Sequence, residues 1–238
     1  MKINLIPIST RIVMPPKDEI WDILDGLDVR EGDIVFITSK ILAIHQGRCV
    51  KGKSKAELIK REAQRWFDYT HRGGFDCSLT ITDNILIPNA GIDESNANGY
   101  LILWPQKVDE LCKEIRDRLC KKNKIKNLGV ISTDSHTTPL RWGVTGITTG
   151  LAGIKPLKDL RGTADIFGRK LVSVRVNMID PLTSMAVLLM GEAAERIPIV
   201  ILRGYKGIEF CEGGSMKDFT IEPSNDIYGP MLEVMAKQ

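Results

Sequence analysis

Short β-rich apolar runs alternate along this chain with stretches of helical periodicity, and that alternation restricts the fold more than any other feature. Residues 33–39 and 197–202 are rich in β-branched and apolar side chains, as expected of buried strands. Between them, residues 107–122 repeat apolar side chains at helical spacing. The apolar face comprises Val108, Leu111, Cys112, Ile115 and Leu119. Strands interleaved with helices predict an α/β or mixed α+β sheet protein.

Capping and turn signals predict the other elements. A helix over residues 54–67 begins with Ser54 and Glu57, the spacing of a capping box. A second helix begins at Asp180, with proline next, and extends to about residue 196. The remaining strands are predicted at residues 128–132 and 171–176 and in a hairpin at residues 79–87, with its turn at Asp83–Asn84.

No repeat, low-complexity tract or linker divides the 238 residues. Residues 1–238 are therefore predicted to form a single compact unit, with two subdomains as the alternative. Hydrophobic residues make up 43% and charged residues 26%, which excludes a disordered chain or a coiled coil. The net charge of +3 gives no reason to expect nucleic-acid binding. The longest apolar runs fall far short of the ~20 residues that a membrane span needs, so no membrane association is expected.

The five cysteines are scattered and odd in number, and none forms a C-x-x-C pair. That usage argues against a disulfide framework or a zinc cluster. The N-terminal residues show no extended apolar segment of the kind found in signal peptides. Together these features predict a cytoplasmic protein with reduced thiols.

One short motif suggests nucleotide chemistry. Residues 47–54 match the phosphate-binding pattern G-x-x-x-x-G-K-[ST], with Lys53 and Ser54 in its last two positions. A P-loop should follow directly from a buried strand, but residues 41–46 separate this segment from the strand that ends near Ser39. Two interpretations therefore stand: a P-loop nucleoside triphosphatase, or a basic loop that leads into a capped helix.

Three acidic residues suggest a metal site. Asp93 lies in a polar loop, and Asp134 directly follows a buried strand, where the ligand sites of open α/β sheets collect. Glu192 falls seven residues after Met185, on the predicted apolar face of its helix, which also holds Leu188 and Leu189. A carboxylate there is costly unless it is paired or binds a cation, and oxygen ligands suit Mg²⁺ or Mn²⁺. The alternative is a helix cap, a turn aspartate and a buried salt bridge.

Several sequence blocks together resemble a known enzyme family. The blocks are residues 37–40, 46–48, 89–96, 134–135, 165–169 and 190–195 with Pro198. In order and spacing they resemble the coenzyme F(420)-0: L-glutamate ligase family, and the block N-A-G-[IV]-D-x-S-N at residues 89–96 is the most specific of them. The resemblance covers residues 3–204 and leaves residues 205–238 as a C-terminal extension.

The resemblance implies the family's own α/β fold, a homodimer, and a GTP-dependent, divalent-metal-dependent reaction that adds L-glutamate to a γ-carboxylate through an amide bond. It implies metal ligands at Asp93, Asp134, Ser135 and Glu192. It implies nucleotide contacts at Thr10, Arg11, Ile12, Val13, Ser39, Lys40, Asn96, Met190, Gly191, Glu192, Ala193, Ala194, Glu195, Arg196 and Ile197.

A carboxylate is a poor electrophile, so amide formation in water needs activation. The expected route is attack of the acceptor γ-carboxylate on the γ-phosphate of GTP or ATP, which gives an acyl phosphate that the glutamate amine then attacks. Mg²⁺ or Mn²⁺ would neutralise the triphosphate, and Lys40 and Arg141 would add positive charge. For Arg141, whose guanidinium offers a bidentate fork to an anion, an ordinary surface salt bridge is the alternative.

Three departures from the family pattern bear on the substrate. The deazaflavin ligases read D-T-F-G-R-P-W-R where this chain has residues 134–141, Lys where it has Ile44, and Gln where it has Glu192. These changes resemble a branch suspected of glutamylating folate. Folate or a related pterin is therefore the expected acceptor, with the coenzyme F(420) precursor second. A non-catalytic nucleotide- or pterin-binding protein of the same fold is the remaining alternative.

Overall fold

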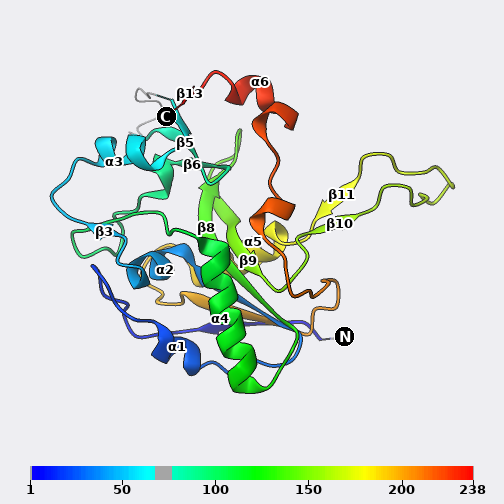
Figure 1. Cartoon of the computed structure of the whole chain (residues 1–238), viewed down its shortest axis with the longest axis horizontal. Helices are drawn as coiled ribbons and strands as arrows, with labels where there is room; N and C mark the ends of the chain where they lie inside the picture. Colours follow the sequence, from blue (N-terminus) through cyan, green and yellow to red (C-terminus); the bar gives the residue numbers. More distant parts are fainter. Residues whose placement is uncertain (1, 68–76, 238) are drawn as a thin grey trace.

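A five-stranded mixed sheet forms the centre of the computed structural model, which describes residues 2–67 and 77–237 (Figure 1). The strand order is β1 (Asn4–Ile8), β12 (Ile199–Arg203), β2 (Asp33–Thr38), β8 (Leu128–Thr137) and β9 (Val144–Ala152). β2 and β8 run parallel, and the other neighbouring strands pair antiparallel. The mixed α/β class is confirmed, as are the strands predicted at residues 33–39, 128–132 and 197–202.

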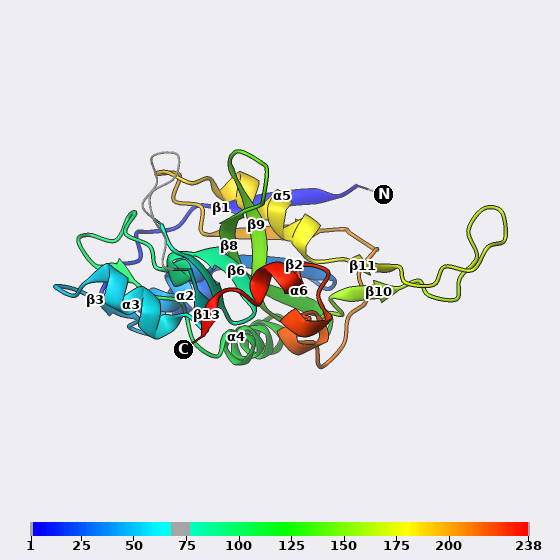
Figure 2. The ribbon, with the colours of Figure 1, turned by 90° about the horizontal axis from the view of Figure 1, so that it is seen from above.

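Helices cover both faces of this sheet (Figure 2). On one face lie α1 (Trp21–Asp25), α2 (Ser39–His45) and α4 (Val108–Asn123), and on the other lies α5 (Asp180–Met190). Successive side chains of β2 divide between the two cores: Val35 and Ile37 pack with α1, α2 and α4, whereas Ile34 and Phe36 pack with α5. Burial on both faces explains why this strand reads as a continuous apolar run.

The helix predicted at residues 107–122 is α4, and all five side chains of its predicted apolar face are buried. Its first turn carries Asp109 and Glu110, and its last turn carries Lys121 and Lys122. These charges complement the helix dipole at both ends. The periodicity therefore predicted both the position of the helix and the face that it buries.

A second, smaller sheet holds the hairpin that leads into the candidate site. Its order is β13 (Ala236–Lys237), β4 (Arg65–Trp66), β5 (Leu79–Thr82) and β6 (Ile85–Pro88). The predicted turn is confirmed, because Asp83 and Asn84 have φ values of 48° and 60°, as a two-residue primed turn requires. The 3-10 turn η1 (Asn89–Gly91) follows β6, and β3 (Cys49–Val50) pairs with β7 (Leu101–Ile102) in a separate ribbon.

The helix predicted at residues 54–67 is shorter than expected. Ser54 caps α3 (Lys55–Glu62) by accepting a hydrogen bond from the Glu57 N–H, as predicted. The helix ends at Glu62, and Arg65–Trp66 instead pair with β5 as strand β4. A local capping signal determined the start of this helix, whereas pairing with a distant strand determined where it ends.

The prediction of a buried strand at residues 171–176 is wrong. β11 (Arg175–Asn177) pairs with β10 (Leu157–Asp159), and the two strands lead to a long ribbon that projects from the body of the protein (Figures 1 and 2). We call residues 157–177 the arm. Apolar side chains on the arm are exposed, with Phe167 at 89% and Val172 at 80%. The β-branched residues that favour a buried strand lie here on a surface ribbon.

The helix predicted from Asp180 to about residue 196 is also shorter than expected, and it buries a different face from the one predicted. It ends at Met190 because Gly191 has a φ of 75°, a conformation that glycine adopts readily. The buried side chains are Leu182, Thr183, Ala186, Val187 and Met190. The predicted core face of Met185, Leu188 and Leu189 is instead exposed. Glu192 therefore lies in the loop after the helix and not on a buried helical face.

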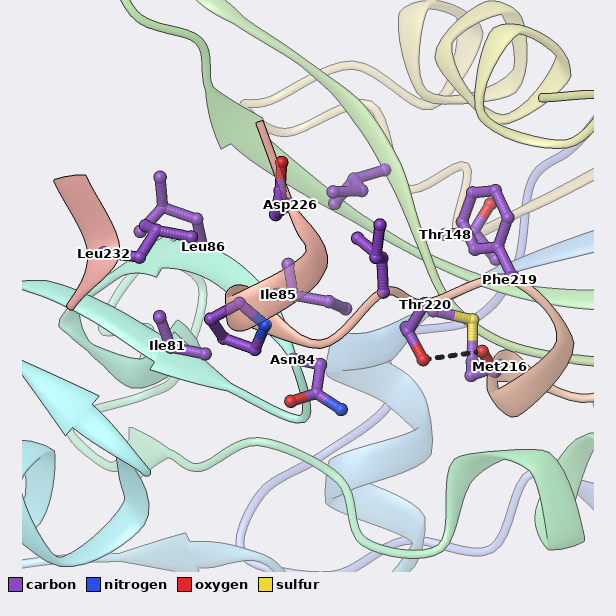
Figure 3. A pocket seen from close by; sticks show the side chains of 13 residues that line it. Ile81, Asn84, Ile85, Leu86, Thr148, Met216, Phe219, Thr220, Asp226 and Leu232 are labelled. Atoms are coloured by element: carbon purple, nitrogen blue, oxygen red, sulfur yellow. Dashed lines mark hydrogen bonds between the residues drawn. The ribbon is translucent and has the colours of Figure 1, made fainter. Parts of the chain in front are cut away.

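The C-terminal residues pack against the β9 edge of the main sheet and against the β5–β6 hairpin. They include η2 (Met216–Asp218), η3 (Pro223–Asn225) and α6 (Gly229–Leu232). Asp109 joins this segment to the sheet, because one carboxylate oxygen accepts from the Leu151 N–H and the other from the Met216 N–H, both at 2.9 Å. A cavity of about 220 Å³ remains between the hairpin and the C-terminal segment, with Ile85 and Phe219 in its lining (Figure 3).

No helix within residues 2–67 and 77–237 is both long enough and apolar enough to cross a membrane. All five cysteines lie within these ranges and are free thiols, as predicted. Burial raises the pKa of the Cys112 thiol, which packs inside α4's apolar face as a small hydrophobic side chain.

Candidate active site

A cleft of about 620 Å³ opens beside the carboxyl end of β2 and the neighbouring stretch 133–135 of β8. The parallel register places Thr38 opposite Thr133, so Ser39, which begins α2, and Asp134, where β8 continues beyond β2, lie side by side at the edge where β2 ends. Ligand sites of open sheets collect at such edges. Three loops complete the walls of the cleft, at residues 10–15, 91–98 and 190–198.

Asp134 is the most enclosed of the carboxylates in the cleft. Ser39 Oγ donates to its Oδ2 at 2.5 Å, and the Ser135 N–H donates to its Oδ1 at 2.7 Å. Burial raises the pKa of Asp134 to about 6, against the opposing effect of these two donors, and the negative charge of Asp93 adds to the rise. A nearby positive charge would therefore stabilise the ionised form of this carboxylate.

Asp93 is held by the tight loop that follows η1. Its backbone N–H and C=O both pair with Ile102, which fixes the loop against β7. Lys40 Nζ lies 2.6 Å from Asp93 Oδ2, and the Ser95 N–H donates to Oδ1 at 2.7 Å. Burial alone would raise the pKa of Asp93, but the Lys40 ammonium and the Ser95 donors outweigh it and lower the pKa. This carboxylate is ionised and paired.

Glu192 reaches the cleft from the loop that follows α5. Ser135 Oγ donates to its Oε2 at 3.4 Å, which joins this loop to the end of β8. Burial raises the pKa of Glu192, and the charges of Asp93 and Glu195 add to the rise, while the Ser135 hydroxyl and Lys40 oppose it. Asp93 thus lies near enough to both Asp134 and Glu192 to raise their pKa values, although the three carboxylates come from distant segments.

The residues present fit a hard divalent cation by their chemistry. Three carboxylates and the Ser135 hydroxyl offer only oxygen donors, which Mg²⁺ and Mn²⁺ prefer. The carboxylates are engaged otherwise in this structure, Asp93 by Lys40 and Asp134 by Ser39. Accordingly, the described part of the chain holds no group of three or more His, Cys, Asp or Glu side chains gathered as for a metal ion. The four-residue metal site remains a prediction.

Every residue predicted to contact a nucleotide lines this one cleft. The set comprises Thr10, Arg11, Ile12, Val13, Ser39, Lys40, Asn96 and all of residues 190–197. Asn96 Nδ2 donates to the Ala193 carbonyl at 2.8 Å and so joins the walls at residues 91–98 and 190–198. The segments to which the resemblance assigns nucleotide contacts are therefore neighbours in space.

The Arg11 side chain contacts other residues of the protein and so stabilises one wall of the cleft. Its guanidinium lies 2.7 Å from Asp18 and 2.9 Å from Asp22, and it also donates to the Glu19 carbonyl at 2.7 Å. These partners anchor the loop at residues 10–15 to the start of α1. The guanidinium is therefore already paired within the protein, and Arg11 lines the cleft as part of a loop that these contacts stabilise.

The family model of the F420-0:gamma-glutamyl ligases matches residues 7–204 of this chain. The chain belongs to this family. Proteins named coenzyme F420:L-glutamate ligase are similar over nearly their whole length. That of Methanopyrus kandleri is 32% identical over 96% of this chain and 97% of its own length, and that of Methanosarcina mazei is 39% identical over 94% of each.

A third protein of that name, from Methanothermobacter thermautotrophicus, is 30% identical over 96% of this chain and 99% of its own length. The resemblance found in the sequence blocks is thus confirmed. Membership in a ligase family makes the chain an enzyme. The cleft is lined by residues of the blocks at 37–40, 89–96, 134–135 and 190–195, whereas the block at 165–169 lies on the arm. This cleft is accordingly the candidate active site of a member of the family.

Arg141, predicted to add positive charge, is not in the lining of this cleft. It lies in the turn between β8 and β9, where its guanidinium donates to the Leu140 carbonyl. Its neighbours are highly exposed, with Trp142 at 93%. Proximity to Asp134 in the sequence did not bring Arg141 to the cleft because β8 continues to Thr137 and carries the turn away from it.

The P-loop interpretation does not match the fold of residues 47–54. Strand β3 occupies the middle of this segment, where a P-loop needs an uninterrupted loop to wrap a phosphate. Lys53 is exposed, and the Ser54 hydroxyl accepts a hydrogen bond as the N-cap of α3. The segment is the alternative that the sequence left open, a basic loop that leads into a capped helix.

Sequence reasoning gave no role to Ser95, which holds both Asp93 and Lys40. Its N–H and hydroxyl donate to the Asp93 carboxylate, and its hydroxyl and carbonyl oxygens accept from Lys40 Nζ. A signal was present: a Ser two residues after an Asp in a polar loop is the pattern of a side-chain-to-backbone turn. The ion pair with Lys40 had no such local signal.

Proposed function

We propose that this enzyme is a nucleotide- and divalent-metal-dependent γ-glutamyl ligase, which joins the amine of L-glutamate to a γ-carboxylate of a small-molecule acceptor. The observation that carries this proposal is the convergence of Asp93, Asp134, Glu192 and Lys40 in one cleft, whose lining also includes apolar residues such as Ile44, Val187 and Met190. Such a cleft suits a ligand with a polyanionic end and a flat organic end.

The proposed chemistry has two steps. A γ-carboxylate oxygen of the acceptor attacks the γ-phosphorus of GTP or ATP, the bond to the β-phosphate oxygen breaks, and an acyl phosphate and a nucleoside diphosphate result. The glutamate nitrogen then attacks the acyl carbon, loses a proton, and inorganic phosphate leaves with the electrons of the C–O bond. Neither step needs a nucleophilic side chain. The chain's own task is to hold anions close together in a defined orientation.

Asp93, Asp134, Ser135 and Glu192 are the residues that would hold Mg²⁺ or Mn²⁺. Such a cation neutralises the triphosphate and the charge that develops during phosphoryl transfer. Lys40, on the first turn of α2, extends toward the same carboxylates and would contact phosphate oxygens. The loops at residues 10–13 and 190–197, with Ser39 and Asn96, would bind the rest of the nucleotide.

Two acceptors fit the proposal, because each ends in a carboxylate that can be activated. The names of the relatives support the coenzyme F(420) precursor. Folate or a related pterin is supported by Ile44, an apolar residue of the cleft where the resemblance has lysine, since a less basic cleft suits an acceptor without a phosphodiester. The altered loop at residues 136–140 does not line the cleft, so it gives no support for either acceptor.

We further propose that the enzyme is a homodimer in the cytoplasm. Apolar side chains are exposed on α5, on the arm and at the β8–β9 turn, among them Leu188, Phe167 and Trp142. Exposed apolar patches are typical of interaction surfaces. Five free thiols favour a reducing compartment.

A ligation assay tests the proposed function. The purified chain is incubated with L-glutamate, Mg²⁺ or Mn²⁺, GTP or ATP, and each acceptor in turn, and mass spectrometry measures the gain of one glutamyl unit. Extension that requires glutamate, nucleotide and metal together is the expected result. Nucleotide or pterin binding with no phosphate release in any combination would instead support the non-catalytic alternative.

A further inference from the structure

Lys40 Nζ occupies a position on the Asp93 loop that is lined by oxygen atoms. It lies 2.6 Å from Asp93 Oδ2, 3.0 Å from Ser95 Oγ and 3.2 Å from the Ser95 carbonyl oxygen. An ammonium group has three donors, and these three oxygens accept them. A carboxylate, a hydroxyl and a carbonyl oxygen are also the types of ligand that a hard divalent cation binds. The lysine therefore fills a cation position with its own charge.

The backbone of Lys40 is fixed, but its ammonium group is not enclosed. α2 buries Ile41, Leu42, Ala43 and Ile44, which hold the helix against the sheet. The Lys40 and Asp93 side chains are nevertheless 25% and 40% exposed, and both line the cleft. A competing cation can reach Asp93 through the cleft, and the flexible four-carbon stem lets Nζ move to another anion there.

The charges around Lys40 favour replacement of its ammonium by a divalent cation only when a nucleotide binds at the same time. The Lys40 ammonium is a positive charge that acts on Asp93, Asp134 and Glu192 at once. A divalent cation that binds these carboxylates alone must lie beside the ammonium, and like charges at that separation repel. The phosphates of a nucleotide would give Lys40 a new anionic partner and so relieve the repulsion.

We infer that the Lys40 ammonium occupies the metal position of the cleft: it pairs with Asp93 until a divalent cation and a nucleotide bind together, and then moves from Asp93 to the phosphates. This inference rests on the proposed function for the identity of the two ligands. Its consequence is that metal alone binds weakly and that metal and nucleotide favour each other's binding, because coupling between two sites is reciprocal.

The test compares binding of Mn²⁺ alone with binding of Mn²⁺ together with a non-hydrolysable GTP or ATP analogue, using the full chain. Free Mn²⁺ is measured by electron paramagnetic resonance, and the analogue complex by titration calorimetry. The variants are Lys40→Met and Lys40→Gln, which remove the charge, and Lys40→Arg, which keeps it. Lys55→Met is the matched control, because Lys55 pairs with Glu94 at 2.9 Å, next to Asp93 but outside the cleft lining.

Lys40→Met and Lys40→Gln are expected to bind Mn²⁺ alone about 5- to 50-fold more tightly than the unmodified chain, and to bind the Mn²⁺–analogue complex less tightly. Lys40→Arg and Lys55→Met are expected to leave binding of Mn²⁺ alone unchanged. A purely structural role for Lys40 would move both affinities in the same direction. Unchanged or weaker binding of Mn²⁺ alone by Lys40→Met and Lys40→Gln overturns the inference, and so does tighter binding by Lys40→Arg.

The outcomes separate this inference from the proposed function. A chain that ligates glutamate, with Lys40→Met binding Mn²⁺ as the unmodified chain does, overturns the inference and leaves the function standing. If the affinities for Mn²⁺ alone and for the Mn²⁺–analogue complex shift in opposite directions but the chain extends no acceptor, the inference about Lys40 is supported and the ligase function is overturned.

Discussion

Ser39 donates a 2.5 Å hydrogen bond to Asp134 across 95 residues of sequence. The contact follows from sheet topology, because β2 and β8 are parallel neighbours whose last paired residues are Thr38 and Thr133. β2 ends there and Ser39 begins α2, whereas β8 continues with Asp134 in its pairing with β9, so the two residues lie side by side. The hydroxyl group and the carboxylate therefore meet at the bottom of the cleft, where burial raises the pKa of Asp134 to about 6.

Asp134→Asn should lower turnover on the order of 10²-fold or more while leaving the fold intact, because the amide keeps the shape of the side chain and loses the charge. Turnover is measured in the ligation assay and the fold by circular dichroism. Asp117→Asn on the exposed face of α4 is the control and should retain activity. Full activity of Asp134→Asn would remove this residue from the proposed chemistry.

Lys53→Ala should retain nearly full turnover, whereas Asp93→Asn should lose most of it, because Lys53 is exposed outside the cleft and Asp93 lies within it. A P-loop enzyme would give the reverse ranking. Steady-state rates of phosphate release from GTP and ATP rank the two variants. Ser54→Ala tests the same segment in another way: it should cost about 1 kcal/mol of unfolding free energy through the lost N-cap, with no effect on turnover.

The metal-free chain should lose stability as pH rises from about 4 to about 6 by an amount that depends on Asp134. Folding raises the pKa of this carboxyl, so the folded state binds the proton more tightly than the unfolded chain. The stabilisation is complete below the unfolded pKa and is lost as pH rises through the folded one, with a maximum of about 3 kcal/mol.

Unfolding free energies of the unmodified chain and of Asp134→Asn, measured in urea between pH 4 and 7 with a chelator present, isolate this effect. The difference between them should change with pH in that interval, because groups such as Asp18 and Asp22, whose pKa values are lowered by Arg11, contribute equally to both proteins. A difference that stays constant across the interval would contradict the assignment.

Leu188→Asp should convert the proposed dimer to a monomer. Leu188 is 83% exposed on α5, beside Met185 and Leu189, and a charge buried there in an interface would lack a partner. Molar mass by light scattering at micromolar protein is the measurement, and Val234→Asp, at a similarly exposed apolar position in the C-terminal segment, is the control. A monomeric unmodified chain that is fully active would exclude the dimer.

Gly91→Ala should destabilise the loop that holds Asp93. Gly91 has a φ of 68°, and a Cβ there would lie 2.1 Å from Trp104 Cε3. The indole cannot easily move, because its Nε1 donates to Asp83 at 2.9 Å. We expect a loss of roughly 2 kcal/mol or more in unfolding free energy. Gly52→Ala, with a φ of 72° and open space around it, should cost only about 1 kcal/mol, and equal losses would show that the Trp104 contact is unimportant.

The sequence by itself determined the elements whose signals are local. The apolar period of α4 predicted all five of its buried side chains, the Asp83–Asn84 pair predicted the hairpin turn, and the Ser54–Glu57 spacing predicted where α3 begins. Each signal reflects interactions within a few residues along the chain. The sequence blocks also identified the segments that line the cleft, through resemblance rather than through physical reasoning.

Tertiary structure decided which apolar faces are covered and which charges meet. The α5 sequence is apolar around most of its circumference, so period alone could not show that Val187 faces the sheet and Leu188 faces outward. Residues 171–176 of the arm match the pattern of a buried strand because alternating β-branched residues favour extended backbone but do not show what packs against them. The Lys40–Asp93 pair and the Ser39–Asp134 bond depend on the parallel register of β2 and β8 and on the loop pinned to β7, and no local pattern encodes contacts over such separations.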